Sequence, residues 1–203
     1  GAHVARDAEY GDRLPLMLRD WRNRWGNDCP FDIVQLANYR KVQEGPEESE
    51  WAELREAQTK TLRLENTGMA VIIDIGDADD IHPKNKPEAG RRLALQALAK
   101  TYGRTVLCSG PVYAACTLGN GEILIRFSKT DGGLKTVDGG VVKGFCIAGG
   151  DHRFHMAEAR IAGDQAIVRS PEVASPQAGR PPWSTHRRRH LPSRRAPAGG
   201  PVP

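Results

Sequence analysis

The sequence predicts an α/β protein in which a parallel sheet covered by helices is followed by a smaller antiparallel β region. Two observations support this fold class. Helical and strand-like segments alternate over roughly the first hundred residues, and short apolar runs separated by glycine turns follow from about residue 110. With 39% hydrophobic and 27% charged residues, the composition is that of an ordinary folded domain.

Three helices are predicted in the first region, residues 1–107. Apolar side chains at helical spacing indicate a helix over 12–25 and a second one over 49–64, with Ser49 as its N-cap. A third helix is predicted over 83–102, where Leu, Ala and Gln alternate before a glycine.

Two strands are predicted between these helices, FDIVQLAN at 31–38 and MAVIIDIG at 69–76. The order helix, strand, helix, strand, helix is typical of a parallel sheet covered on both faces. Two strands alone would leave a sheet edge and an apolar face uncovered. We therefore interpret this region as the second half of a larger sheet.

The second region, residues 108–175, predicts antiparallel strands between about 110 and 174. Its runs PVYAACTL, EILIRFS, GFCIAG and AIVRS are separated by the turn signals NG, DGG, GG and GD. This pattern is typical of a small β domain or a β extension.

Residues 176–203 differ in composition and predict a disordered tail. Pro, Arg, Gly and Ser dominate, so the segment cannot bury enough apolar surface to offset its ordering entropy. The tail contains six arginines and no acid, and removing them from the net charge of +4 leaves −2 for the rest. The basicity of the chain therefore indicates no specific nucleic-acid site in its body.

No metal or cofactor site is predicted. The four cysteines show no CxxC spacing and are interpreted as small buried hydrophobic residues: Cys29, Cys108, Cys116 and Cys146. His152 and His155 are three residues apart in an expected strand and would point to opposite faces, which favours two surface histidines. No apolar run approaches the roughly 20 residues of a membrane span, and Gly1 opens no signal peptide.

The stretch DADDIHPKNK, residues 77–86, follows the second predicted strand and leads into a helix. Ligands of parallel α/β sheets bind beyond the carboxyl ends of the strands. Asp79 and His82 have D-x-x-H spacing, which would let the carboxylate orient the imidazole, and Asp80 is the competing partner. Helix capping by an aspartate with Pro83 in the first turn is the alternative interpretation.

Other polar and aromatic residues have two interpretations. Gln35 and Asn38 end the first predicted strand on the same side of the sheet, where they would line a sugar site or cap backbone groups. Trp21, Trp25 and Trp51 could stack on a sugar ring, but their helical spacing favours core or groove packing.

The string VIIDIGDADDIHPKNKPEAGRRLALQALAKTYG resembles the last catalytic block of the sialate O-acetylesterase family, carbohydrate acetylesterases of the SGNH hydrolase superfamily. The resemblance continues through LPLMLRDWRNRWG, PFDIVQLANY and SEWAELREAQ upstream, and SGPVY and KGFCIAGGDHRFHMAEARIAGDQAIVRSPEVASP downstream. It covers roughly residues 1–176. It implies part of a flavodoxin-like three-layer sheet.

The resemblance also implies a serine esterase that removes acetyl groups from sugar hydroxyls without a cofactor. His82 would be the general base and Asp79 or Asp80 its orienting acid. The substrate would be an O-acetylated carbohydrate, and family members are often secreted or periplasmic. Any address would precede Gly1, and the oligomeric state is not indicated.

The chain departs from the family pattern at three places. No GQSNM or GxSxG string occurs, so the nucleophilic serine is expected outside this chain. Gly1 would match an oxyanion-hole glycine, whereas Val4 stands where the family has an asparagine, and losing one such donor typically costs about 100- to 1000-fold in rate. The tail has no counterpart in the family.

Two hypotheses follow. The first is the C-terminal portion of a sialate O-acetylesterase-like enzyme. The second is a catalytically inactive fragment whose Arg-rich tail binds anionic surfaces or nucleic acid nonspecifically.

Overall fold

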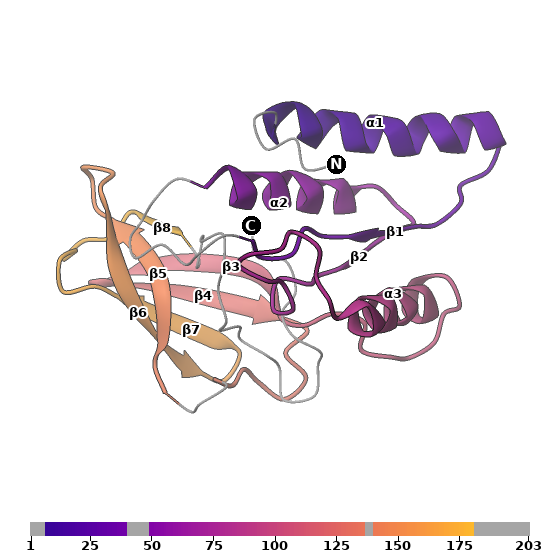
Figure 1. The fold of residues 1–203 in the computed structure, drawn as a ribbon. Coiled ribbons are helices and arrows are strands. Elements are labelled where there is room, and N and C mark those ends of the chain that lie inside the picture. Colours follow the sequence, from indigo (N-terminus) through magenta and orange to yellow (C-terminus); the bar gives the residue numbers. More distant parts are fainter. Residues whose placement is uncertain (1–6, 40–48, 137–139, 181–203) are drawn as a thin grey trace.

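The computed structural model describes residues 7–39, 49–136 and 140–180. It shows a small parallel sheet with helices on either side, beside a larger curled antiparallel sheet (Figure 1). The mixed α/β class and the change to antiparallel strands agree with the sequence prediction. The described residues contain two parallel strands, so the expected flavodoxin-like three-layer sheet stays a prediction. The predicted disordered tail lies outside the described residues from 181 onward.

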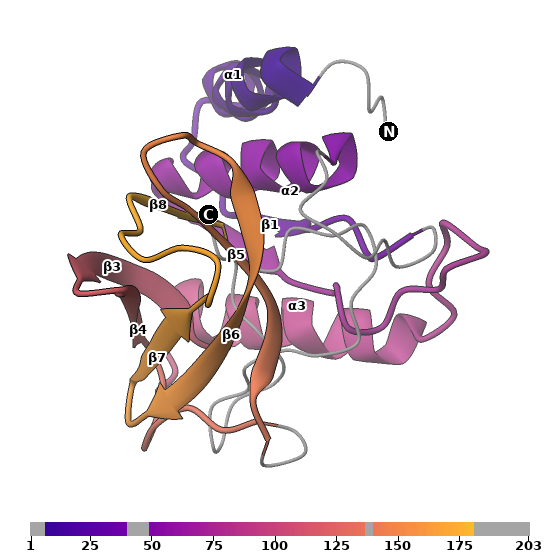
Figure 2. The same cartoon turned by 90° about the vertical axis from the view of Figure 1, so that its left-hand side faces the viewer.

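The first region contains three α-helices, one short 3-10 helix and two strands. They are α1 (Asp7–Trp25), β1 (Phe31–Val34), α2 (Glu50–Lys60), η2 (Thr61–Arg63), β2 (Thr67–Ala70) and α3 (Lys86–Lys100). β1 and β2 pair in parallel, with Phe31 opposite Thr67 and Val34 opposite Ala70. Figures 1 and 2 both place α1 and α2 on one side of these strands and α3 on the other.

The two strands are shorter than predicted because the chain finds other hydrogen-bond partners at their ends. After β1, the backbone N–H of Leu36 donates to the side chain of Gln58 at 2.9 Å, and the Trp51 indole donates to the Ala37 carbonyl at 2.7 Å. After β2, the carbonyl of Val71 accepts from Arg92. Beyond both strands, side chains of the helices thus bond to backbone groups that a neighbouring strand would otherwise satisfy. Val71, just after β2, is nevertheless buried as its apolar sequence predicts.

The helices differ from the predictions mainly at their ends. α1 begins at residue 7 rather than 12, and an ion pair between Glu9 and Arg13, one turn apart, supports its added first turn. Ser49 caps α2 as predicted, accepting from the backbone N–H of Ala52. α3 begins three residues after Pro83, with Asn85 as its N-cap. None of the described helices is long and apolar enough to cross a membrane.

The second region is a six-stranded antiparallel sheet with the strand order β3-β4-β7-β6-β5-β8. Its strands are β3 (Val112–Gly119), β4 (Glu122–Ser128), β5 (Val142–Ala148), β6 (Phe154–Ala162), β7 (Gln165–Arg169) and β8 (Ala178–Arg180). The predicted NG turn joins β3 to β4, where Gly121 has a φ of 73°, a left-handed conformation that glycine adopts at little cost.

β8 corrects the predicted boundary at residue 175. Residues 178–180 were expected to be disordered, but they pair with β5 and complete the edge of the sheet. Gly179 lies close to the end of the Ile123 side chain on β4, since a Cβ at this position would be 2.9 Å from Cδ1 of Ile123. Arg180 adds a cation–π contact, 4.0 Å from the ring centre of Phe154. Composition misses this strand because its partner is 30 residues away in the sequence.

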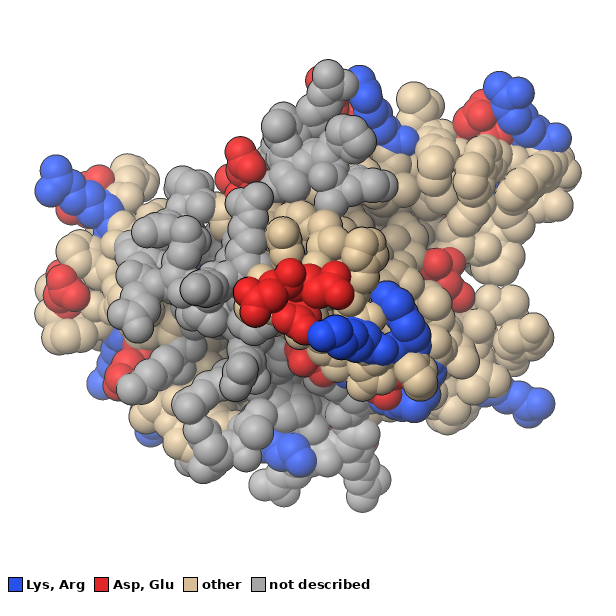
Figure 3. All heavy atoms as spheres, viewed as in Figure 1, with Lys and Arg blue, Asp and Glu red and all other residues tan. Residues whose placement is uncertain are grey.

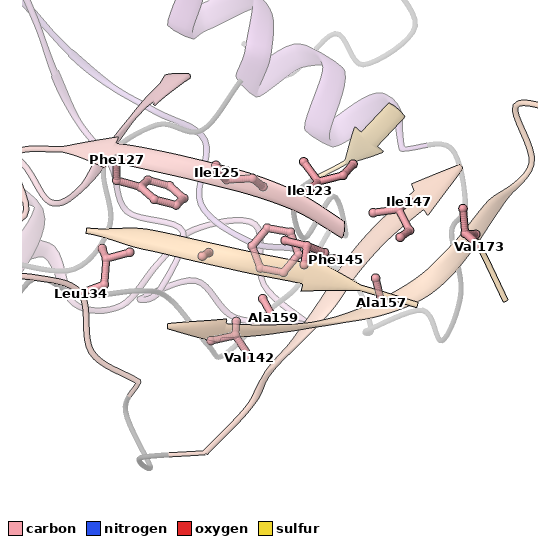
Figure 4. Packing of buried hydrophobic residues seen from close by; sticks show 12 residues of the cluster. Ile123, Ile125, Phe127, Leu134, Val142, Phe145, Ile147, Ala157, Ala159 and Val173 are labelled. Atoms are coloured by element: carbon pink, nitrogen blue, oxygen red, sulfur yellow. The ribbon is translucent and has the colours of Figure 1, made fainter. Parts of the chain in front are cut away.

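The curled sheet encloses an apolar core of its own (Figure 4). Phe145, Ile147 and Val168 are among its most buried side chains. Phe145 and Ile147 lie two residues apart on β5, so they point to the same side of the sheet, and Val168 of β7 belongs to the same cluster.

Candidate active site

The candidate site lies on the loop between β2 and α3, residues 71–85, beyond the carboxyl end of β2. The loop after β1 packs against it. A Cβ at Gly76 would lie 2.3 Å from the Asn38 carbonyl oxygen, so only glycine permits this close approach. Both parallel strands therefore end at one place, where α/β proteins bind their ligands.

A buried arginine anchors the start of this loop to α3. The Arg92 side chain is 6% exposed and binds the Asp74 carboxylate through both terminal nitrogens, with Nη2 and Oδ2 2.6 Å apart. Nη1 also donates to the Val71 carbonyl at 2.6 Å. This bidentate pair fixes where the chain leaves β2. Local spacing does not predict this pair, because its two residues are 18 positions apart in the sequence.

Glu88, in the first turn of α3, completes this anchor. Its carboxylate accepts from the side chain of Arg91 and from Nε of Arg92, at 2.7 and 2.8 Å. The hydrogen bond from Arg91 is the largest of the contributions that lower the pKa of Glu88 to about 2. The four-residue spacing of Glu88 and Arg92 was visible in the sequence, but the burial of Arg92 was not.

His82 and Asp80 form the only predicted catalytic pair that the structure brings together. The Asp80 carboxylate oxygen Oδ1 accepts from the backbone N–H of His82 at 2.8 Å and lies 3.3 Å from its ring nitrogen Nδ1. The backbone hydrogen bond is the largest cause of a lowered pKa for Asp80, so this carboxylate stays ionised. An Asp-His pair of this kind orients the imidazole so that Nε2 faces outward.

The structure gives Asp79 another position, although it has the D-x-x-H spacing. Its backbone N–H donates to the carboxylate of Asp77 at 3.0 Å, and no described hydrogen bond joins its carboxylate to His82. Two successive side chain-to-backbone turns, Asp77 to Asp79 and Asp80 to His82, shape the loop. The contact with His82 therefore comes from Asp80, two residues before it, and not from Asp79, three residues before it.

The pair is open to solvent. The side chain of His82 is 80% exposed and that of Asp80 is 43% exposed. Figure 3 shows acidic side chains gathered over this loop, with basic side chains next to them. Lys84 contributes to this mixed surface through an ion pair with Asp77 at 3.4 Å.

Gln35 and Asn38 are buried, which favours their structural interpretation. Gln35 is 4% exposed, and its amide nitrogen donates to the Arg55 carbonyl and to the Thr59 hydroxyl of α2. Asn38 is 3% exposed under the loop that contains Gly76. Gln35 thus ties the strand end to α2, and a role of either residue in a sugar site stays a prediction.

The tryptophans divide into two groups. Trp51 is 4% exposed and belongs to the core, as predicted. Trp21 and Trp25, for which core or groove packing was expected, are 40% and 58% exposed and so do not belong to the core. Their rings contact each other and Phe31 at the start of β1, at the opposite end of the sheet from His82.

The other predicted residues are the histidines around the start of β6, the cysteines and Gly1. Among residues 7–39, 49–136 and 140–180, no group of three or more His, Cys, Asp or Glu could hold a metal ion. His155 lies 2.9 Å from the Glu172 carboxylate. Of the four cysteines, only Cys146 is buried as predicted, and Cys116 is exposed on β3. Gly1, the predicted oxyanion residue, lies outside the described residues.

One solved structure similar to this chain is the crystal structure of XAC1771, described as a novel carbohydrate acetylesterase from Xanthomonas citri. The two share 44% sequence identity with a TM-score of 0.87, over 96% of this chain and 45% of that chain. The chain thus spans less than half the length of this neighbour. No protein-family model matches the sequence, and no curated protein matches it. The structural similarity supports the carbohydrate acetylesterase part of the predicted resemblance.

Proposed function

We propose that this chain contributes the general base to an esterase that removes O-acetyl groups from sugars, of the sialate O-acetylesterase type within the SGNH superfamily. The observation that carries the proposal is the Asp80–His82 pair at the end of a parallel strand, in a chain 44% identical to a carbohydrate acetylesterase. The proposal makes two claims that are tested separately: the chain acts in an ester hydrolase, and the substrate is an O-acetylated sialic acid.

In the proposed reaction, Nε2 of His82 takes the proton of a serine hydroxyl as the serine oxygen attacks the acetyl carbonyl carbon. The proton then passes to the sugar oxygen as the ester bond breaks, which leaves an acetyl-serine. A water molecule, deprotonated by the same nitrogen, attacks the acetyl group and releases acetate and the free serine. The Asp80 carboxylate stabilises the imidazolium in both steps.

The nucleophilic serine is proposed to come from outside this chain. Three of its serines have structural roles: Ser49 caps α2, Ser128 donates to the Val112 carbonyl, and Ser170 accepts from the Glu172 backbone. No described hydrogen bond joins any of these three serines to His82. We therefore expect the chain alone to hydrolyse acetyl esters no faster than a buffer blank.

A chimera tests the proposal. The part of the Xanthomonas citri enzyme that this chain does not match would be joined to this chain at the boundary of the match. We expect the chimera to hydrolyse p-nitrophenyl acetate, and His82→Ala to lower kcat by about 100-fold or more. A folded chimera whose hydrolysis is unchanged by His82→Ala would contradict the proposed base.

The two aspartates provide a matched pair of variants in the same chimera. Asp80→Asn should lower kcat strongly, because a neutral amide stabilises the imidazolium poorly. Asp79→Asn should leave kcat within about twofold of the parent, because among the described residues only Asp80 has a carboxylate in hydrogen-bond contact with the His82 ring. If Asp79→Asn lowered kcat more than Asp80→Asn, the carboxylate that orients His82 would be that of Asp79.

The kind of acetylated sugar that is cleaved needs a separate comparison of substrates. The chimera should release acetate from an O-acetylated sialic acid faster than from acetylated xylan. Activity on xylan alone would retain the esterase proposal and reject the sialate type.

A further inference from the structure

The loop of the candidate site, residues 71–85, owes its local shape to contacts within itself. The backbone N–H of Asp79 donates to the Asp77 carboxylate, and that of His82 donates to the Asp80 carboxylate. Such turns fix the path of the chain over a few residues. They bond the loop to itself, so they do not place the His82 ring relative to the rest of the molecule. Contacts between the loop and other elements have to do this.

Arg92 of α3 fastens the start of the loop to the helix in which the loop ends. Its Nη1 donates to the Val71 carbonyl at 2.6 Å, and its Nη2 donates to the Asp74 carboxylate at 2.6 Å. Its Nε donates at 2.8 Å to Glu88, one turn earlier on α3, which holds the guanidinium in one orientation. His82 lies in the segment between these two fastened ends.

The Arg92 contacts are shielded from water, whereas the pair that they support is not. The side chains of Arg92 and Asp74 are 6% and 17% exposed, and those of His82 and Asp80 are 80% and 43% exposed. A buried bidentate pair constrains both the distance and the angle between its partners, while water competes for an exposed one. The position of the exposed pair therefore depends on the buried one.

The shape of an arginine side chain is what this contact requires. A guanidinium presents five N–H donors in one rigid plane, whereas the lysine ammonium is a single nitrogen. The three nitrogens of Arg92 bind three groups at once: the carboxylates of Glu88 and Asp74 and the carbonyl of Val71. A lysine would keep the positive charge but could not hold all three groups.

From these contacts we infer that Arg92 is a positioning residue for the proposed base: it holds the loop so that Nε2 of His82 reaches the serine hydroxyl. Arg92 itself touches neither the substrate nor the reacting atoms. This role rests on the proposed function, because it presumes that His82 is the base. A displacement of about 1 Å caused by a change far from the chemistry can lower a rate by about 100-fold, so the role should be visible in kcat.

The chimera described above tests this role with p-nitrophenyl acetate, a substrate that has neither a charge nor a sugar. We expect Arg92→Lys to lower kcat by about tenfold and to leave KM within about twofold, because substrate binding does not involve Arg92. Arg91→Lys is the matched control, since Arg91 also binds Glu88 but not Asp74. It should leave kcat within about twofold. Equal kcat values for the two variants would overturn the inference.

Combination with His82→Ala distinguishes positioning from a general loss of structure. If Arg92 acts through His82, Arg92→Lys should lower the residual rate of the His82→Ala chimera by less than about twofold, because the ring to be positioned is absent. A tenfold loss in both backgrounds would show that Arg92 acts by another route, and the inference would be wrong. Thermal unfolding checks that each variant is folded at the assay temperature.

Asp74→Asn tests the same contact from its other side and serves also if Arg92→Lys does not fold. An asparagine keeps the shape of the side chain but has one acceptor oxygen instead of two, so the bidentate contact is lost. We expect kcat to fall by about tenfold, and the double variant with Arg92→Lys to lose no more than about twofold beyond either single variant. Fully additive losses would overturn the assignment to this pair.

The chain alone supplies a measurement that does not depend on catalysis. In nuclear magnetic resonance spectra of the ¹⁵N-labelled chain, the amide signals of Asp79 and His82 should shift in Arg92→Lys and Asp74→Asn. They should stay in place in Arg91→Lys. Unmoved signals in Arg92→Lys would contradict the inference. If the signals shift as expected but the parent chimera hydrolyses no acetyl ester, Arg92 does fasten the loop and the proposed function fails.

Discussion

The antiparallel region and the helical region stabilise themselves in different ways. Phe145, Ile147 and Val168 are at most 2% exposed and belong to one continuous apolar core inside the curled sheet. The helical region buries fewer large apolar side chains together and depends on polar anchors such as Gln35 and Arg92. Its tryptophans on α1 are open. The difference shows that the antiparallel region is held together mainly by its apolar core, whereas the helical region depends also on buried polar contacts.

Removing the Phe145 side chain should destabilise the antiparallel region and leave the helical region unaffected. We expect Phe145→Ala to lower the free energy of unfolding of this region by about 3 to 5 kcal/mol, because a buried aromatic ring leaves a cavity. Hydrogen exchange should speed up in β5 to β7 and stay unchanged in α3. Leu118→Ala, on an exposed position, should change the free energy by less than about 0.5 kcal/mol. Equal acceleration in α3 would show that the two regions unfold as one unit.

Removing Arg92 should weaken the helical region instead. Arg92→Ala leaves the Asp74 and Glu88 carboxylates without their buried partner, and we expect a loss of about 3 kcal/mol in the free energy of unfolding. Tryptophan fluorescence during denaturant unfolding measures it, with Trp183→Phe as background so that only Trp21, Trp25 and Trp51 report.

Arg91→Ala is the matched control for this loss. It removes an arginine that also binds Glu88 but is 51% exposed, and should cost about 1 kcal/mol or less. If the two variants lose the same stability, burial of Arg92 is not what anchors the loop.

The smallest expected effect concerns pH. The pKa of Glu88 is about 2 in the folded chain and ordinarily 4.5, so its ion pairs contribute full stability above about pH 4.5. This contribution falls as the pH decreases from 4.5 toward 2, because the unfolded chain binds the proton first. Unfolding curves at a series of pH values should therefore show a flatter acid decrease for Glu88→Gln. An unchanged slope would mean that other carboxylates dominate.

Local patterns in the sequence determined the element order, the switch to antiparallel strands and the loop of the candidate site. Helical spacing, turn residues and the polar run after an apolar strand are properties of neighbouring residues, so they are readable without a structure. Examples are Ser49, which caps a helix, and the NG turn formed by Asn120 and Gly121.

Contacts between distant residues decided the rest. β8 forms because Ala178–Arg180 find β5, and β1 ends early because Gln58 and Trp51 bind the chain that follows it. Spacing alone left Asp79 and Asp80 as alternatives for His82, and the fold of the loop brought Asp80 to the ring. Helical spacing likewise could not distinguish the buried Trp51 from the exposed Trp21, because burial depends on which other elements pack against a helix.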